Sequence, residues 1–332
     1  MQMKKIGLVL AGGGGRGAYQ IGVWKALHET GLDNYITSVS GTSVGGLNAA
    51  LFIQDNLNIA QNTWNSISMS KILTHKSDSD QHFKRPSFYE RDGLKKIIDD
   101  NLDMRCFDNS NYNCWLTCLR KDKWATPQLE YEEIYTLPDG TKTVRKFVDG
   151  PREYFNMKYY NDEQRMQILL ATSAMPFIFP KEKVDGHEYG DGGTGIYGGD
   201  NVPVKPLYEV DKCDIILIVH LDNMDEPVKQ KDFPNARLHD LFPKEKVGRI
   251  LDFTAEGAKK RIQQGYEENI GLFRHIREMI DSTQESSQKL GEIRAEQMQN
   301  DAQEKDLDDI EKKLLYDYAR IKQKEGDSEI WR

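Results

Sequence analysis

Long apolar runs are absent from this 332-residue sequence, although 38% of its residues are hydrophobic. A helix that spans a bilayer needs about 20 consecutive apolar residues, and no run in the chain approaches that length. Residues 6–10 are too few for the apolar core of a signal peptide, and no cleavage site follows them. We therefore expect no transmembrane segment and a cytoplasmic protein, with peripheral attachment to a membrane left open.

Positive charge is in deficit. The chain has 45 Lys and Arg residues against 53 Asp and Glu, which gives a formal net charge of -8. Nucleic-acid binding needs a basic face that neutralises phosphates, so this balance argues against a nucleic acid as a partner.

Cysteine is scarce as well. The four cysteines are Cys106, Cys114, Cys118 and Cys213. A disulfide scaffold uses more cysteines in a shorter secreted chain, and no histidine lies close enough in sequence to complete a metal site with Cys114 and Cys118. We expect all four to be reduced and mostly buried, and we expect neither a metal nor another cofactor.

The remaining pattern alternates between strands and helices. The apolar residues 6–10 predict a buried strand, and Ala18, Ile21, Trp24 and Leu27 recur in three-residue steps like the inner stripe of a helix. The same reasoning predicts strands at 35–39, 113–119 and 214–221, and helices from Val44 and over 161–173. This order is typical of an α/β fold with a parallel sheet.

Three parts depart from that order. Alternating segments at 128–136 and 141–149 flank a Pro-Asp-Gly turn, which predicts a β-hairpin. The Ser/Asp/His-rich stretch 74–82 predicts a loop, and a lid over a site is one interpretation of it. From residue 244 the chain is rich in Glu, Lys, Gln and Arg, and we predict two long helices broken near 282–288. We therefore divide the chain into a domain at 1–243 and a charged helical extension at 244–332.

One short motif suggests nucleophilic chemistry. Gly41-Thr42-Ser43-Val44-Gly45 matches G-x-S-x-G, and it lies between a predicted strand and a predicted helix. Such a sharp turn holds a serine hydroxyl out from the protein, where it can attack an ester. A glycine-rich turn in which Ser43 merely caps the helix is the alternative.

A glycine run follows the first strand. Gly13, Gly14 and Gly15 precede Arg16, and such a run leaves backbone N–H groups free to stabilise an oxyanion. Arg16 can brace this loop or attract an anionic head group. Gly12, Gly14 and Gly17 also satisfy G-x-G-x-x-G, the dinucleotide fingerprint. That alternative requires an acidic residue at the end of the second strand, where this sequence has Ser40-Gly41-Thr42-Ser43.

A third motif, Tyr189-Gly190-Asp191-Gly192-Gly193, places a carboxylate among glycines. By itself it fits an ordinary Asp-Gly turn. The glycine loop, then G-x-S-x-G, then Asp-Gly-Gly, in that order, resembles the patatin-like phospholipase family, and so does the stretch 171–180. The likeness covers about residues 5–220.

The resemblance implies a fold and a function. The fold is a three-layer α/β/α sandwich of the patatin type with a mostly parallel central sheet, here with a C-terminal helical extension. Ser43 then matches the family nucleophile and Asp191 its base, with Gly13, Gly14, Gly15 and Arg16 in the oxyanion loop. The implied activity is hydrolysis of fatty-acyl esters of phospholipids or lysophospholipids at a membrane surface. A patatin-like module that only binds acyl groups is the alternative, and a protein partner or self-association through the C-terminal helices stays open.

A histidine could replace the direct Ser43–Asp191 contact. The order Ser43, Asp191, His220 satisfies a Ser-acid-His triad on paper, but His220 lies near the end of an apolar strand and is expected to be structural. His187 is expected to be a turn residue. The apolar run 174–179 is a candidate wall for an acyl chain, with core packing as the alternative.

Overall fold

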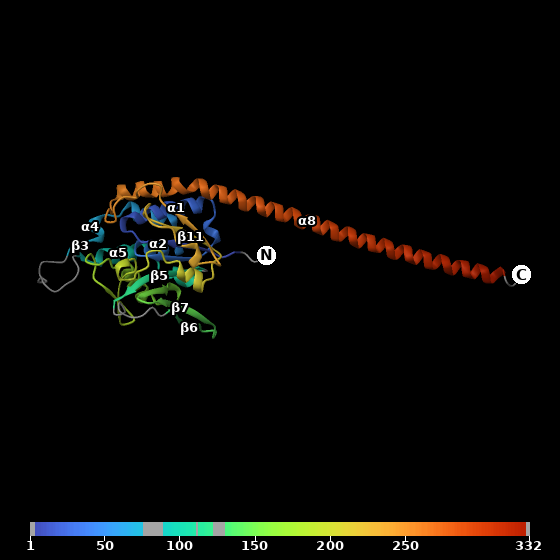
Figure 1. Cartoon of the computed structure of the whole chain (residues 1–332), viewed down its shortest axis with the longest axis horizontal. Coiled ribbons are helices and arrows are strands. Elements are labelled where there is room, and N and C mark those ends of the chain that lie inside the picture. Colours follow the sequence, from blue (N-terminus) through green and yellow to red (C-terminus); the bar gives the residue numbers. More distant parts are fainter. Residues whose placement is uncertain (1–3, 76–88, 111, 122–129, 330–332) are drawn as a thin grey trace. The chain divides into compact units, whose positions relative to one another are not determined.

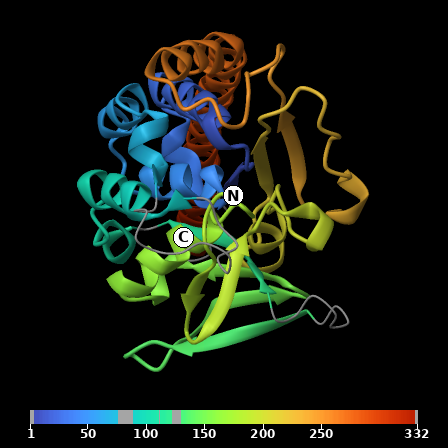
Figure 2. The ribbon, with the colours of Figure 1, turned by 90° about the vertical axis from the view of Figure 1, so that its left-hand side faces the viewer.

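The computed structural model describes residues 4–75, 89–110, 112–121 and 130–329 (Figures 1 and 2). Contacts between residues divide the chain into two units, Met1–Arg274 and His275–Arg332. The first unit holds the sheet and all predicted site residues. The second is described separately below.

Parallel strands form one half of the sheet, in the order β12-β11-β1-β2-β5. These strands are β1 (Ile6–Leu10), β2 (Ile36–Thr42), β5 (Asn113–Arg120), β11 (Ile215–Val219) and β12 (Arg237–Leu241). The predicted strands are therefore confirmed, and β2 continues three residues past the predicted end at residue 39, because Ser40 and Gly41 pair with β1 and Thr42 pairs with β5.

Antiparallel strands form the other half. From β5 the order continues through β8 (Arg152–Asn156), β7 (Lys142–Asp149) and β6 (Glu130–Thr136), while β10 (His187–Asp191) pairs with both β5 and β9 (Glu182–Val184). The predicted hairpin is confirmed for 130–149, and its residues 128 and 129 lie outside the described part of the chain. Of the predicted loop at 74–82, only β3 (Thr74–His75), paired with β4 (Tyr89–Glu90), is described.

Helices cover one face of the sheet (Figures 1 and 2). They are α1 (Ala18–Glu29), α2 (Val44–Ile53), α3 (Leu57–Asn65), α4 (Met69–Ile72), α5 (Asp92–Asn101), α6 (Cys106–Asn109) and α7 (Asp162–Thr172). Helix α7 begins at a capping box, in which Asn161 and Gln164 exchange hydrogen bonds. The four cysteines are free, and all except Cys106 are buried.

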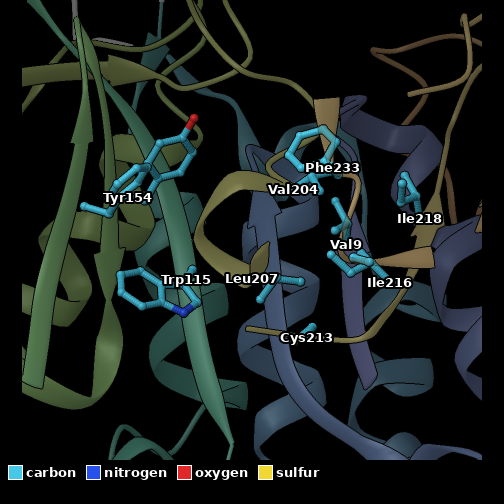
Figure 3. Close-up of a cluster of buried hydrophobic side chains, with 11 residues drawn as sticks. Val9, Trp115, Tyr154, Val204, Leu207, Cys213, Ile216, Ile218 and Phe233 are labelled. Carbon is cyan, nitrogen blue, oxygen red and sulfur yellow. The ribbon is translucent and has the colours of Figure 1, made fainter. Parts of the chain in front are cut away.

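The opposite face packs against a second layer. Because side chains alternate along a strand, Val9 of β1 points away from α1 and joins Ile216 and Ile218 of β11. Leu207 from the π-helical turn η6 (Pro206–Val210) and Phe233 belong to the same cluster (Figure 3). The three-layer α/β/α arrangement is thus confirmed, with a short irregular layer on this second face.

The C-terminal helix is unbroken. Helix α8 runs from Ala255 to Glu329, so the predicted break near 282–288 is wrong. The Thr283 hydroxyl donates to the Met279 carbonyl, and the Ser286 hydroxyl donates to the Ser282 carbonyl. Bonds of this kind satisfy the polar side chains within the helix and remove the reason to end it. No described helix is long and apolar enough to cross a membrane.

The start of α8 belongs to the first unit. A Cβ atom at Gly22 would lie 2.0 Å from the Ile262 carbonyl oxygen, and one at Gly265 would lie 2.1 Å from the Tyr19 carbonyl oxygen. Only glycines let α1 and α8 approach this closely. Residues 244–274 therefore group with the α/β unit, and the extension predicted at 244–332 is divided between the two units.

Candidate active site

Ser43 occupies a strained turn between β2 and α2. Its backbone has φ 55° and ψ -127°, a region that residues other than glycine rarely adopt. A Cβ at Gly41 would lie 2.3 Å from the Gly45 carbonyl oxygen, and one at Gly45 would lie 2.1 Å from the Leu10 carbonyl oxygen. Both glycines are therefore required by close backbone packing. The Ser43 side chain makes no capping bond to α2, so the helix-cap alternative does not describe this residue.

A threonine holds the backbone of this turn. The Ser43 N–H donates to Thr172 Oγ1 at 3.0 Å, and Thr172 Oγ1 donates to the Thr117 carbonyl oxygen at 2.6 Å. The end of α7 is thereby tied to the Ser43 turn and to β5. Thr172 was missed as a site residue, although it lies in the 171–180 stretch that carries part of the family resemblance.

Asp191 meets Ser43 directly. It ends β10, and Ser43 Oγ donates to Asp191 Oδ2 at 2.7 Å. The Gly193 N–H donates to Asp191 Oδ1 at 2.8 Å. Burial raises the pKa of Asp191 from 3.8 to about 6, although the bonds from Ser43 and Gly193 act to lower it. The carboxylate is thus a stronger base than an exposed aspartate and is still ionised at neutral pH.

The glycine loop borders the serine. Gly14 has φ 56°, and the Gly15 N–H donates to the Ile250 carbonyl oxygen at 2.6 Å. Within the described part of the chain, no atom accepts a hydrogen bond from the Gly13 or Gly14 N–H. Two of the three predicted oxyanion donors are therefore available, and the third is engaged by a segment that sequence reasoning did not identify.

Arg16 braces this loop. Its Nε donates to the Gly248 carbonyl oxygen at 2.9 Å, and its Nη1 lies 2.7 Å from Asp222 Oδ2. Of the two predicted roles, the structure thus shows the bracing one. On the other side of the loop, the Asn201 amide donates to the Gly12 carbonyl at 3.2 Å. No sequence motif pointed to Asn201.

The histidines have other partners. His220 is fully buried, with Nε2 2.7 Å from Asp240 Oδ1 and its ring stacked on Phe242. His187 Nδ1 lies 2.8 Å from Arg120 Nη2. The described residues include no cluster of three or more His, Cys, Asp or Glu side chains that could hold a metal ion.

Two hollows meet at Ser43. One is apolar, has a volume of about 100 Å³, and extends among helices α2, α3, α5 and α7. The second, the polar hollow, has a mixed polar and apolar lining, is more open at about 450 Å³, and reaches Asp191, Asn201 and Asp222. Gly14, Ser43 and Met175 line both. The site can therefore hold a molecule with one apolar and one polar end, with the serine at the junction.

The run 174–179, predicted as a wall for an acyl chain, borders the apolar cavity only in part. Met175, Ile178 and Phe179 line the apolar cavity. Phe177 lines neither hollow and is 68% exposed, because its backbone at φ 67° turns it outward, and Ala174 is buried elsewhere. Leu251 and Phe253 complete the cavity, and sequence reasoning had placed them outside the first domain.

These observations define an α/β protein with a buried serine–aspartate pair at a strand–turn–helix junction. The family model for patatin-like phospholipases matches residues 8–208. This match covers more than half of the chain, so the chain belongs to the patatin-like phospholipase family.

Sequence similarity to curated proteins is local. Over 52 residues the chain is 50% identical to lysophospholipase nte1 of Aspergillus terreus, which is 16% of this chain and 3% of that protein. Over 69 residues it is 45% identical to neuropathy target esterase sws of Drosophila sechellia, which is 21% of this chain and 4% of that protein. The matches thus span only a small part of these much longer relatives.

Two solved structures are similar at a lower level. VipD from Legionella pneumophila has a TM-score of 0.41 at 11% identity, over 82% of this chain and 67% of that one. Human GIVD cytosolic phospholipase A2 has a TM-score of 0.45 at 10% identity, over 84% of this chain and 60% of that one.

Proposed function

We propose that this chain is a serine acyl hydrolase that cleaves fatty-acyl esters of phospholipids or lysophospholipids through a Ser43–Asp191 dyad. One observation carries the proposal: the 2.7 Å hydrogen bond from Ser43 Oγ to the buried Asp191 carboxylate, at the junction of an apolar and a polar hollow. Family membership and the lysophospholipase relatives support the same class of substrate.

In the acylation step, Ser43 Oγ attacks the ester carbonyl carbon while its proton passes to Asp191 Oδ2. A hydroxyl needs such a base to become nucleophilic, and a pKa of about 6 makes Asp191 a better acceptor than an exposed aspartate. The N–H groups of Gly13 and Gly14 stabilise the oxyanion. Gly15, whose N–H is bound to Ile250, supports the loop instead.

Acylation is completed when Asp191 protonates the departing alcohol or lysolipid oxygen, which leaves a Ser43 acyl ester. In the deacylation step, a water molecule attacks this ester as Asp191 takes its proton, and Ser43 Oγ recovers that proton when the fatty acid leaves. One aspartate thus serves as base and acid in both halves of the reaction. The acyl chain occupies the apolar cavity, and the leaving group occupies the polar hollow.

The reaction is proposed to occur at a membrane surface, by a cytoplasmic protein attached peripherally. Four of the segments that line the polar hollow expose a large apolar side chain at or within two residues of a lining position. This apolar rim consists of Phe177, Ile196, Met224 and Ile250. Single apolar side chains around an opening suit a lipid surface, into which they insert without a shaped partner groove.

Vesicle binding tests the membrane surface without depending on catalysis. In a Ser43→Ala background, Ile196→Asp with Met224→Asp should reduce sedimentation with phosphatidylcholine vesicles several-fold. Ile134→Asp, at an exposed position on the hairpin, is the matched control and should bind like its parent. Equal binding by both proteins would contradict the rim.

The second unit is proposed to bind another copy of itself. Along α8, the exposed residues Met279, Ile293, Leu307 and Leu314 are separated by multiples of seven, which is the spacing of a coiled-coil seam. A long helix with such a stripe gains its stability from a partner helix. Leu307→Asp should lower the sedimentation coefficient to that of a monomer, whereas Met298→Asp, which is exposed but off the stripe, should not.

Catalysis is tested by comparing wild type with Ser43→Ala and Asp191→Asn. Both variants should fold, judged by circular dichroism, and both should lose p-nitrophenyl ester hydrolysis. Full activity in either would refute the dyad, and loss of activity in a folded His220→Ala would favour a triad.

A non-catalytic acyl-binding module is the second candidate, and it predicts no Ser43 labelling by a fluorophosphonate probe. A lipid panel assayed by mass spectrometry against Ser43→Ala then identifies the substrate.

A further inference from the structure

The glycine loop leans on a segment that follows the matched family region. The family model ends at residue 208, whereas residues 247–252 pack directly on Gly14 and Gly15. A Cβ at Gly14 would lie 2.3 Å from the Ile250 carbonyl oxygen, and one at Gly15 would lie 2.2 Å from the Asp252 carbonyl oxygen. The glycines at these two positions thus serve this packing as well as the site.

One buried arginine ties the two parts together. Arg261, in the second turn of α8, is 4% exposed. Its Nη1 donates to the Gly15 carbonyl oxygen at 3.1 Å and to the Asp252 carbonyl oxygen at 3.0 Å. Its Nε donates to the Val247 carbonyl oxygen at 3.1 Å, and its Nη2 pairs with the Asp252 carboxylate. The planar guanidinium holds several acceptors at fixed angles, which lysine cannot do.

The Gly15 residue is therefore held at both of its polar backbone groups. Its N–H is bound to Ile250, and its C=O is bound to Arg261. Gly14, directly before it, carries one of the two proposed oxyanion donors. Because glycine is the most flexible residue, the direction of the Gly14 N–H depends on what fixes its neighbours.

We propose that Arg261 is a positioning residue of this active site: it aims the oxyanion donors by clamping Gly15 to the 247–252 segment. The inference rests on the proposed function, because it assigns Arg261 to the stabilisation of an oxyanion. Arg261 lines neither of the two hollows at Ser43. Its effect reaches the reacting atoms through the Gly14–Gly15 backbone, so its loss weakens transition-state binding more than ground-state binding.

The test is steady-state hydrolysis of p-nitrophenyl butyrate by Arg261→Gln and Arg261→Lys. A misplaced donor costs about 10- to 100-fold in rate, so Arg261→Gln should lower kcat by about that factor with KM within twofold. Arg261→Lys should recover part of kcat, because one ammonium can reach the Gly15 carbonyl. Arg274→Gln is the control: Arg274 lies on the same helix, is exposed, and pairs with Glu29, so kcat should be unchanged.

A structural role alone predicts a different pattern. If Arg261→Gln merely destabilises the fold, the folded fraction should retain wild-type kcat per active site, counted by fluorophosphonate titration. If Arg261→Gln does not fold, Arg261→Gly is assayed instead, with millimolar guanidinium added to replace the missing side chain. Recovery of kcat by the added guanidinium supports the proposal, and no recovery overturns it. If folded Arg261→Gln has wild-type kcat and Ser43→Ala is inactive, the proposal for Arg261 is overturned and the dyad is not. An active Ser43→Ala would instead overturn the dyad.

Discussion

Replacing Asp191 with asparagine should abolish hydrolysis and, as the pH rises, make the protein increasingly stable relative to wild type. The carboxyl group is buried, and its pKa rises from 3.8 to about 6 on folding. The folded protein therefore binds this proton more tightly than the unfolded chain does. Stability from this group is fully present below about pH 4, is lost as the pH rises through about 6, and is absent above that value.

The magnitude follows from the two pKa values. A difference of about two in pKa corresponds to about 3 kcal/mol of unfolding free energy, of which about 1.4 kcal/mol falls between pH 5 and pH 8. Asparagine does not titrate, and its amide can keep both contacts by donating to Ser43 Oγ and accepting from the Gly193 N–H. Relative to wild type, Asp191→Asn should therefore gain about 1.4 kcal/mol from pH 5 to pH 8 while it loses hydrolysis.

Urea denaturation followed by tryptophan fluorescence at pH 5, 6, 7 and 8 measures this difference. Asp222→Asn is the control. Its carboxylate has a lowered pKa, first because of the Met224 N–H and then because of Arg16, so it stays ionised over this range. The free-energy difference of that variant from wild type should not vary with pH. A pH-independent difference for Asp191→Asn as well would refute the raised pKa of Asp191.

Three further outcomes are expected. Wild-type kcat/KM should fall about tenfold per pH unit below pH 6, because protonated Asp191 cannot accept a proton, and a flat profile down to pH 5 would contradict this role. Phe179→Ala should raise the hydrolysis rate of dodecanoate esters relative to that of butyrate esters, because Phe179 lines the cavity. Phe177→Ala should leave this ratio unchanged, because Phe177 lies outside the cavity, and equal responses of the two variants would contradict the acyl site. Thr172→Val should lower the free energy of unfolding, measured by urea denaturation, by about 1–3 kcal/mol, because the Ser43 N–H and the Thr117 carbonyl lose their hydrogen-bond partner. Thr172→Ser keeps the hydroxyl and should approach wild-type stability.

The break predicted in the C-terminal helix shows where local reasoning fails. Ser282, Thr283 and Ser286 have weak helix preference, which is why the sequence indicated an interruption. In the structure, the hydroxyls of Thr283 and Ser286 bond back to carbonyls one turn earlier, and the helix continues. Helix preference is only a weak indicator when side chains can satisfy themselves within the helix.

The domain boundary predicted at residue 243 was based on amino-acid composition, because the chain becomes rich in charged residues from that point. Composition does not reveal that Gly265 lets α8 lie directly against Tyr19 and Gly22, nor that Arg261 reaches back to Gly15. These contacts join positions about 245 residues apart, and no periodicity or motif in one sequence encodes them.

Local sequence patterns predicted the alternation of strands and helices, the sharp turn at Ser43 and the need for glycine at positions 41 and 45. Each of these follows from local backbone geometry and short-range periodicity, which are properties of neighbouring residues. The folded chain was needed to show that Asp191 reaches Ser43, that His220 pairs with Asp240, and that the Gly15 N–H donates to the Ile250 carbonyl. These contacts depend on strand order and layer packing, which bring distant segments together and leave no local trace in the chain.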